Sequence, residues 1–218
     1  MIKINYIVLD TETSNTFDDP FCYDCGWAVL NDNFEVIETR SFVVAEIFLN
    51  KELMKEAYFA DKIPQYWEDI KNGTRELKTF KNIRKQLHED FYNFGVSAIV
   101  AHNARFDYKS CQTTQRWLTK SKYRFFFPFG AEIWDSLKMA RQTFAKDDDY
   151  RQFCIDNGYC VNNSTRPRLT AEILYRYMTK NNNFVESHTG LEDVLIEKEI
   201  LKQCLAMNSE IDCKTWNN

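Results

Sequence analysis

The sequence predicts an α/β domain in which helices flank a mixed central sheet, and two observations lead to that class. Near the N-terminus an apolar run is followed by a β-hairpin pattern, whereas strand-like and helix-like segments alternate in the rest of the chain. A hairpin followed by such alternation is typical of α/β and α+β domains. The 218 residues contain no repeat and no Gly/Ser-rich linker, so we expect one domain over residues 1–218.

Five segments have the pattern of strands. The first is "NYIVLD" at Asn5–Asp10, and Gly26–Asn31 and Phe34–Val44 form the hairpin across the turn-forming "NDN". Gly95–Ala101 and Ala131–Asp135 are short apolar runs that predict buried strands further along the chain.

Helices are predicted for most of the remainder. After Thr74, apolar residues recur at spacings of three and four and predict one face of a helix. They are Leu77, Phe80, Ile83, Leu87, Phe91 and Phe94. Charged helical sequence interrupted by Pro64 and Gly73 precedes them. Further helices are expected over 104–120, 136–146, 169–180 and 191–208.

The composition limits the function classes. With 28 basic and 32 acidic residues the formal net charge is −4, which argues against binding nucleic acid mainly through a large basic surface. A nuclease stays open, because bound metal ions reverse the sign of a carboxylate-rich cleft. The chain has neither an apolar run of 18 residues nor a signal-peptide pattern, so we expect a cytoplasmic protein that does not bind membranes.

The seven cysteines do not form the pattern of a disulfide framework, because the chain lacks a secretory signal. Cys22 and Cys25 have the spacing of a zinc-ligand pair, but Cys154 and Cys160 are too far apart to supply the second pair. We therefore expect small thiols in a loop that leads into a strand, with structural zinc as the alternative.

The first polar motif is "DTET", which ends an apolar run. Side chains alternate across a strand, so Asp10 and Glu12 point to the same side and Thr11 points away. Two carboxylates brought together in this way repel each other unless solvent or a cation compensates. The carboxyl end of a central strand is also where α/β sheets place their sites. A solvated strand end is the alternative that this motif alone leaves open.

The second motif is "HNARFD", which follows a buried strand and begins a helix. With Asn103 as the N-cap, His102 and Asp107 occupy the two positions that meet in a hydrophobic staple, although both are polar here. We expect them to lie together where the helix dipole favours a carboxylate. The alternative is capping alone, with His102 bonded to the backbone.

The third motif is "HTGLED". Thr189 and Glu192 fit a capping box, which bends His188 back over Asp193. On a continuous helix these two would lie about 140° apart, off a common face. The alternative is a purely structural histidine.

Taken together, the motifs predict a metal site. Four carboxylates, Asp10, Glu12, Asp107 and Asp193, are expected in one cleft with a histidine, and they need cations. Two Mg²⁺ or Mn²⁺ ions roughly 4 Å apart would meet that need and clamp a phosphodiester for attack by water.

In order and relative position, "DTET", "HNARFD" and "HTGLED" resemble the three motifs of the DEDDh family of 3′–5′ exonucleases, which includes the proofreading subunit of bacterial replicative polymerases. The resemblance runs from about Tyr6 to Cys204, and the stand-alone form is similar to phage-encoded members. It implies an RNase H-like fold with a five-stranded sheet whose second strand is antiparallel.

The resemblance also implies roles. Asp10 would bridge both metals, Glu12 and Asp193 would complete the site of the metal that activates water, and Asp107 would hold the second metal. His188 would be the general base. The residues implied in substrate binding are Thr11, Thr13, His102, Asn103 and Phe106.

The function expected from this resemblance is metal-dependent 3′–5′ hydrolysis of single-stranded or frayed ends, with DNA favoured, to nucleoside 5′-monophosphates. The partners would be the 3′ ends of single-stranded DNA or RNA, and a polymerase or another replication protein for proofreading in trans. One alternative is an exoribonuclease that trims RNA or short oligoribonucleotides. The other is a catalytically silent module that binds nucleic-acid ends or a partner protein.

Three segments depart from the family pattern or add to it. Lys51–Gly73 and Tyr150–Pro167 are not obvious parts of the family core and could set the substrate range. Gln115–Gly130 mixes basic and aromatic residues; we favour a helix end followed by a strand that buries the aromatics, with a base-stacking surface as the alternative.

Overall fold

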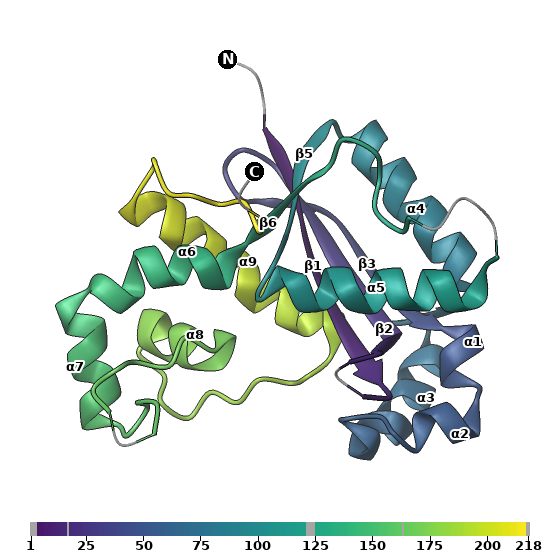
Figure 1. Cartoon of the computed structure of the whole chain (residues 1–218), viewed down its shortest axis with the longest axis horizontal. Coiled ribbons are helices and arrows are strands. Elements are labelled where there is room, and N and C mark those ends of the chain that lie inside the picture. The colour runs from purple at the N-terminus through teal and green to yellow at the C-terminus, as the bar shows by residue number, and fades with distance from the viewer. Residues whose placement is uncertain (1–3, 17, 121–124, 163, 217–218) are drawn as a thin grey trace.

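The computed structural model describes residues 4–16, 18–120, 125–162 and 164–216, and in this part of the chain six strands form one sheet (Figure 1). The strands are β1 Asn5–Ser14, β2 Phe21–Leu30, β3 Val36–Val44, β4 Glu76–Lys78, β5 Val96–Ala101 and β6 Glu132–Asp135. Their order is β4-β3-β2-β1-β5-β6. Only β2 runs antiparallel to its neighbours, while β1 pairs parallel with β5, β5 with β6 and β3 with β4.

The predicted fold class and the antiparallel second strand are thereby confirmed, but the strand count is wrong. The additional strand, β4, has three residues at the edge of the sheet and includes Leu77, which the apolar spacing had assigned to a helix. A three-residue strand is too short to show an alternating pattern of its own.

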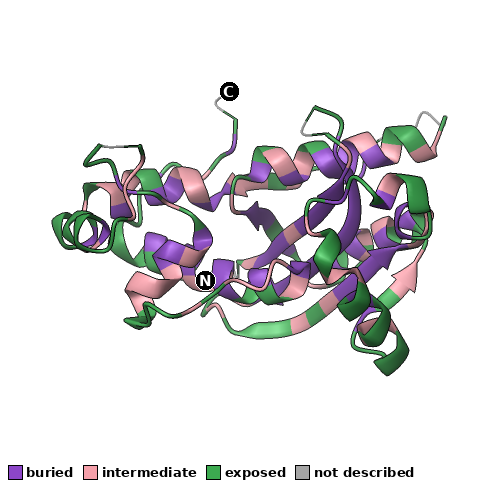
Figure 2. Ribbon diagram, turned by 90° about the horizontal axis from the view of Figure 1, so that it is seen from below, coloured by how far each residue is buried: buried purple, intermediate pink, exposed green. Residues whose placement is uncertain are grey.

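Helices cover both faces of the sheet (Figures 1 and 2). They are α1 Ala45–Phe48, α2 Lys51–Met54, α3 Ile63–Asn72, α4 Phe80–Asn93, α5 Ala104–Leu118, α6 Ser136–Gln142, α7 Asp148–Asp156, α8 Ala171–Thr179 and α9 Gly190–Met207, with 3₁₀ turns at Ala60–Lys62 and Phe144–Lys146. One core lies under α1 to α5 and contains Ile7 and Leu9 of β1. The other lies under α6 to α9 and contains Tyr6 and Val8. The alternation of β1 therefore decides which helices each of its side chains meets.

Strand β1 does not end at Asp10, as the apolar run suggested, but continues to Ser14 because β2 pairs with it along its whole length. On the other side, β5 pairs with β1 only as far as Val8. The apolar run stops where the neighbouring strand ends, not where β1 ends. Asp10 and Glu12 thus lie beyond the carboxyl end of β5, on the face that α9 covers.

Two glycines let α9 approach the sheet closely. A Cβ atom on Gly26 of β2 would lie 2.3 Å from the backbone nitrogen of Leu191, and one on Gly190 would lie 2.9 Å from the nitrogen of Gly26. Side chains at these positions would separate the two backbones. The start of α9 is therefore held directly over the part of β1 and β2 that carries the carboxylates.

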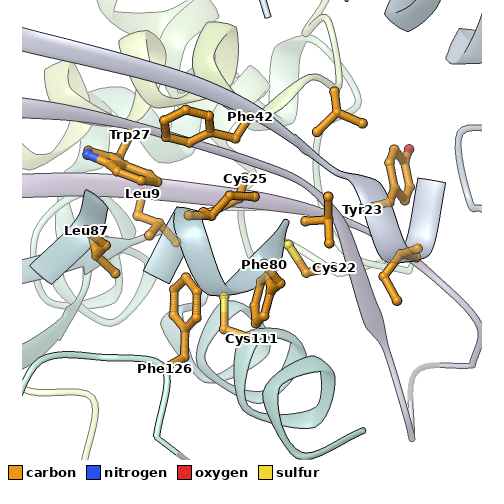
Figure 3. Close-up of a cluster of buried hydrophobic side chains, with 14 of the residues drawn as sticks. Leu9, Cys22, Tyr23, Cys25, Trp27, Phe42, Phe80, Leu87, Cys111 and Phe126 are labelled. Atoms are coloured by element: carbon orange, nitrogen blue, oxygen red, sulfur yellow. The ribbon is translucent and has the colours of Figure 1, made fainter. Parts of the chain in front are cut away.

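Cys22 and Cys25 lie inside β2, so the prediction of a loop was wrong. The pairing of β1 with β2 shifts by one residue at Tyr23, a bulge that lets both cysteines face Cys111 of α5. The three sulfur atoms lie within 4.8 Å of one another, and all three side chains are buried. Aromatic and aliphatic side chains surround them (Figure 3). Their surroundings are those of core residues.

Other differences follow from local turn chemistry. Phe34 has a φ of 63° and belongs to the hairpin turn, so β3 begins at Val36. Helix α8 begins two residues later than predicted, because the side chain of Thr170 accepts a hydrogen bond from the Ile173 amide and caps it. Helix α7 was not predicted. No helix among the described residues has the length and apolar character needed to span a membrane.

Candidate active site

The three motifs meet at one cleft of about 810 Å³. Its lining includes nine of the ten predicted site residues, which are Asp10, Thr11, Glu12, His102, Asn103, Phe106, Asp107, His188 and Asp193. Thr13 is the exception: it is buried, and its carbonyl accepts a hydrogen bond from the Tyr58 amide. Thr13 is therefore not among the residues that line the cleft, and its role in substrate binding stays a prediction.

Asp107 reaches the cleft from the first turn of α5 and is fixed by β1. Its Oδ1 accepts hydrogen bonds from the Thr11 amide at 3.1 Å and from the Thr11 hydroxyl at 2.9 Å. The same hydroxyl lies 2.9 Å from the hydroxyl of Ser110. Thr11 points away from Asp10 and Glu12, as predicted, and this orientation lets it hold the third carboxylate from the opposite face of the strand.

His188 and Asp193 meet at the start of α9, as the third motif predicted. Ligand atoms of Glu12, His188 and Asp193 lie within 4.8 Å of one another. Thr189 is the N-cap, but the capping box differs from the prediction. The Thr189 amide donates to Asp193 at 3.1 Å, and Glu192 instead accepts from the Thr189 hydroxyl at 2.7 Å. Asp193 thus takes the bond expected of Glu192, and His188, the residue before the cap, has a φ of 54°.

An aromatic ring packs against the imidazole of His188. Phe59 stacks on the imidazole, with ring centroids 4.3 Å apart and planes inclined by 9°. The histidine side chain is 37% exposed, and its Nδ1 lies 4.0 Å from Oε2 of Glu186. Phe59 belongs to the segment Lys51–Gly73, so this segment supports the histidine of the cleft rather than extending away from it.

His102 does not pair with Asp107 as expected. Its Nε2 donates to the carbonyl of Leu169 at 2.7 Å, and its Nδ1 lies 3.0 Å from the hydroxyl of Ser136. The structure therefore has the alternative arrangement, in which His102 is hydrogen-bonded to the backbone. Asn103 is at the N-cap position of α5 but has a φ of 72° and makes no side-chain cap bond.

Asp135, at the end of β6, holds the backbone of Asn103 at the start of α5. Asp135 accepts hydrogen bonds from the Asn103 amide at 3.1 Å and from the amides of Leu137 and Lys138, where it caps α6. It thus joins the starts of α5 and α6, and the side chain of Asn103 is left on the cleft wall.

Burial raises the pKa of every carboxyl group that the motifs place in the cleft, and repulsion from other carboxylates raises it further for Asp10, Glu12 and Asp193. The pKa rises to about 9 for Glu12, to about 8 for Asp193 and to about 7 for Asp107, and burial is the largest cause in each case. The pKa of Asp10 is also raised well above its usual range, by burial and then by Glu197. Such a set holds its protons when no cation is present.

Burial lowers the pKa of His188, so its imidazole is neutral at neutral pH. A neutral imidazole can accept a proton. A proton acceptor therefore lies beside the carboxylates, which is the arrangement needed for general base catalysis.

Three features of the site were missed from the sequence. Glu197, one turn after Asp193 on α9, is a fifth carboxylate in the cleft, and its spacing of four residues is a signal that could have revealed it. Glu186 also lines the cleft, and burial raises its pKa to about 7. The stacking of Phe59 on His188 has no local sequence signal, because the two residues are distant in the sequence and only the fold brings them together.

A buried ion-pair network anchors the start of α9 to the sheet. Arg75 lies 3.2 Å from the Asp24 carboxylate and 2.6 Å from that of Glu192. Asp24, opposite Glu12 in β2, also accepts hydrogen bonds from the Gly190 amide at 2.9 Å and the Tyr66 hydroxyl at 2.6 Å. This network holds α9 in register with β2, and hence Asp193 with Glu12.

The lining of the cleft also includes basic residues. Arg141, Arg166 and Arg168 line the cleft together with apolar residues, and all three are exposed. Arg166 and Arg168 lie at the end of the segment that follows α7, within or next to the addition noted at Tyr150–Pro167. The cleft therefore combines buried carboxylates with exposed arginines.

The stretch Gln115–Gly130 lies apart from this lining. Phe126 and Phe127 are buried, as favoured, but the predicted strand was wrong: residues 125–130 form no strand, and Phe125 and Phe129 are exposed. None of its described residues lines the cleft. Lys122, Tyr123 and Arg124 lie outside the described residues.

The donor set fits hard divalent cations. The carboxylates and one imidazole offer oxygen and nitrogen ligands, and Glu197 has a buried carboxylate oxygen without a hydrogen-bond partner among the described residues. Divalent cations would relieve the repulsion that raises the carboxyl pKa values.

Comparison with known proteins gives structural but not sequence matches. No protein-family model and no curated protein matches the sequence. Exonuclease X in complex with 5′ overhanging duplex DNA matches with a TM-score of 0.52 and 14% identity, over 94% of each chain. Cell-death related nuclease 4 matches with a TM-score of 0.59 and 16% identity, over 94% of this chain and 64% of that one.

Exonuclease I from Methylocaldum szegediense also matches, with a TM-score of 0.59 and 16% identity, over 95% of this chain and 41% of that one. The chain thus spans less than two thirds of two of these three proteins. The likeness shows that the chain has the RNase H-like fold of these exonucleases.

Proposed function

We propose that the protein is a metal-dependent 3′–5′ exonuclease of the DEDDh type, which hydrolyses single-stranded or frayed DNA ends to nucleoside 5′-monophosphates. The observation that carries the proposal is the meeting of Glu12, His188 and Asp193 within 4.8 Å in a cleft that Asp10 and Asp107 also line. These residues come from three distant segments. A purely structural role would not require like charges to be gathered in one place.

Asp10, Glu12, Asp107 and Asp193 would hold two Mg²⁺ or Mn²⁺ ions. When bound, the ions would act as Lewis acids toward the phosphodiester and neutralise the charge that develops on it. The roles follow the family resemblance: Asp10 shared between both ions, Glu12 and Asp193 on one, and Asp107 on the other. Thr11 would keep Asp107 oriented through its two hydrogen bonds.

His188 would act as the general base. Its ring nitrogen would accept the proton of a water molecule whose oxygen forms the new bond to phosphorus, while the bond to the 3′-oxygen of the preceding nucleotide breaks. The products would be a nucleoside 5′-monophosphate and a strand shortened by one nucleotide with a free 3′-hydroxyl. Phe59 would hold the imidazole plane during this transfer.

The substrate would bind along the cleft. His102, Asn103 and Phe106 would form the wall around the terminal nucleotide. Arg141, Arg166 and Arg168 would bind backbone phosphates, which is how proteins hold nucleic acid independently of sequence. Single-stranded DNA is the favoured substrate class, in line with the E. coli Exonuclease I structure in complex with a dA16 oligonucleotide, which has the same fold at 15% identity and a TM-score of 0.55.

Three further expectations stay predictions: one domain over the whole chain, a cytoplasmic location, and a polymerase or another replication protein as a partner. The likeness to phage-encoded members is likewise a prediction.

The proposal is tested by following product sizes over time on 5′-labelled single-stranded DNA and matched RNA, with Mg²⁺, with Mn²⁺ and with EDTA. We expect a metal-dependent ladder that shortens from the 3′ end and is absent in Asp193→Ala. The relative rates on the two strands rank DNA against RNA. If neither strand is cut although both bind, the fold acts as a binding module and the proposal is wrong.

A further inference from the structure

Glu186 and Glu197 line the cleft but lie outside the DEDDh motifs, and Glu197 is the more deeply buried of the two. Glu197 lies four residues after Asp193 on α9, so both side chains project from the same face of the helix toward β1. Both are only 4% exposed, and both line the cleft with Asp10. Glu197 is therefore a buried carboxylate of the same cleft as the motif residues.

One carboxylate oxygen of Glu197, Oε2, is buried and has no hydrogen-bond partner among the described residues. A buried carboxylate oxygen normally accepts a hydrogen bond or binds a cation.

The nearest charged groups cannot supply that partner. The groups that act on Glu197 electrostatically are Asp107, Asp193 and Glu186, all of them acidic. Glu197 is in turn the strongest like-charge neighbour of Asp10. A buried carboxylate with an unpartnered oxygen among other carboxylates has the environment of a metal ligand.

We propose that Glu197 is a fifth carboxylate ligand of the divalent metal centre, shared with Asp10. This inference rests on the proposed function, because it needs the metal centre that the four motif carboxylates would form. It adds a ligand that the motifs do not supply, and it gives the chain a more negative metal site than four carboxylates would.

The test measures Mn²⁺ binding to the full chain without nucleic acid, by electron paramagnetic resonance of the free ion. The variants are Glu197→Gln, Asp193→Asn and, as a matched control, Glu199→Gln, since Glu199 lies on the same helix but pairs with Lys198 outside the cleft. We expect Glu197→Gln to weaken Mn²⁺ binding by at least about tenfold, in the range found when metal-site residues are lost. Glu199→Gln should bind as the unmodified protein does.

Wild-type Mn²⁺ affinity in Glu197→Gln, together with weakened binding in Asp193→Asn, would overturn the role of Glu197 and leave the proposed function intact. Unchanged affinity in both variants would overturn the metal centre itself. If Glu197→Gln does not fold, Glu197→Asp keeps the charge but shortens the reach: weaker binding supports the proposal, and wild-type binding contradicts it.

Discussion

Asp10 illustrates how a single residue can be costly for the fold and necessary for the site. It lies among Glu12, Asp107, Asp193 and Glu197, and burial and these neighbours raise its pKa. Asp10→Ala should abolish metal-dependent cleavage without lowering the melting temperature in EDTA, because it removes like-charge repulsion. Cleavage assays and thermal melts of both proteins in EDTA check this. A marked drop in melting temperature would contradict the metal-site interpretation.

His188 is predicted to affect chemistry rather than binding. His188→Ala should slow hydrolysis by about 10²–10⁴-fold, the usual contribution of a general base, and leave metal-dependent DNA binding largely intact. Single-turnover rates and binding isotherms separate the two effects. His88, a half-buried histidine of α4 bonded to the Phe126 carbonyl, is the matched control, and His88→Ala should keep the hydrolysis rate. A fully active His188→Ala would remove this residue from the general-base role.

The sequence predicted the placement of single residues where that placement depends only on their near neighbours in the chain. Asp10 and Glu12 follow from strand alternation, and His188 with Asp193 follows from a helix start, so each pair needs only a few consecutive residues. Phe59 and the hydrogen bonds of His102 could not be predicted in this way. Their partners come from distant segments, and only the packed fold brings them together.

At the scale of elements, the crossing of α9 over β2 decides whether the motifs meet. Gly26→Ala would place a Cβ atom 2.3 Å from the backbone of Leu191, so α9 must move away from the sheet. We expect a loss of cleavage and a larger drop in melting temperature than for Gly73→Ala. At Gly73 there is open space around the added atom, and only the left-handed backbone, costing about 1 kcal/mol, opposes alanine. Equal melting temperatures for the two variants would show that α9 does not depend on this close approach.

The arginines that line the cleft are predicted to bind phosphates, so the affinity for DNA should depend on the salt concentration. Replacing Arg141, Arg166 and Arg168 by Gln should weaken binding of single-stranded DNA and reduce the slope of log affinity against log salt by about 0.7 for each phosphate that is no longer neutralised. Filter binding at several salt concentrations measures both. The control is Arg151→Gln, because Arg151 of α7 pairs with Asp148 and does not line the cleft. An unchanged slope in the triple variant would exclude these arginines as phosphate ligands.

Elements were predictable in proportion to their length and periodicity. The hairpin of β2 and β3 and the helix α4 have patterns long enough to identify, although their ends shifted by a few residues. The short edge strand β4 and the helix α7 were missed. In α7 the charged "KDDDY" masks a helix start that Asp147 caps by accepting a hydrogen bond from the Tyr150 amide.

For the whole molecule, the sequence predicted the layered α/β class and the antiparallel second strand, because topology follows from the order of elements. It could not predict that β1 passes beyond β5, which is what opens space for the cleft. That geometry depends on the relative lengths of strands that are distant in sequence.

The buried carboxyl groups of the cleft predict how the stability of the whole molecule depends on pH when metal is absent. In the fold, the pKa values of Glu12, Asp193 and Asp107 are raised to about 9, 8 and 7. The folded protein therefore keeps protons that the unfolded chain releases, and its stability is lost as the pH rises through these values. Between pH 7 and 9 the melting temperature in EDTA should fall.

The histidines and Cys111 do not reverse the predicted fall of the melting temperature with pH. The lowered pKa values of His102 and His188 lie below the window, so their effect is complete by pH 7. Cys111, with a pKa lowered to about 6, acts in the opposite sense, but it is one group against three carboxyls.

Saturating Mg²⁺ should flatten the same profile, because a cation bound to the carboxylates favours their charged form and removes the advantage of protonation. Thermal melts at pH 7, 8 and 9, with Mg²⁺ and with EDTA, make the comparison on one preparation. A melting temperature in EDTA that rises over this window would show that the cleft carboxylates are already compensated without metal, and the reason for placing cations among them would be lost.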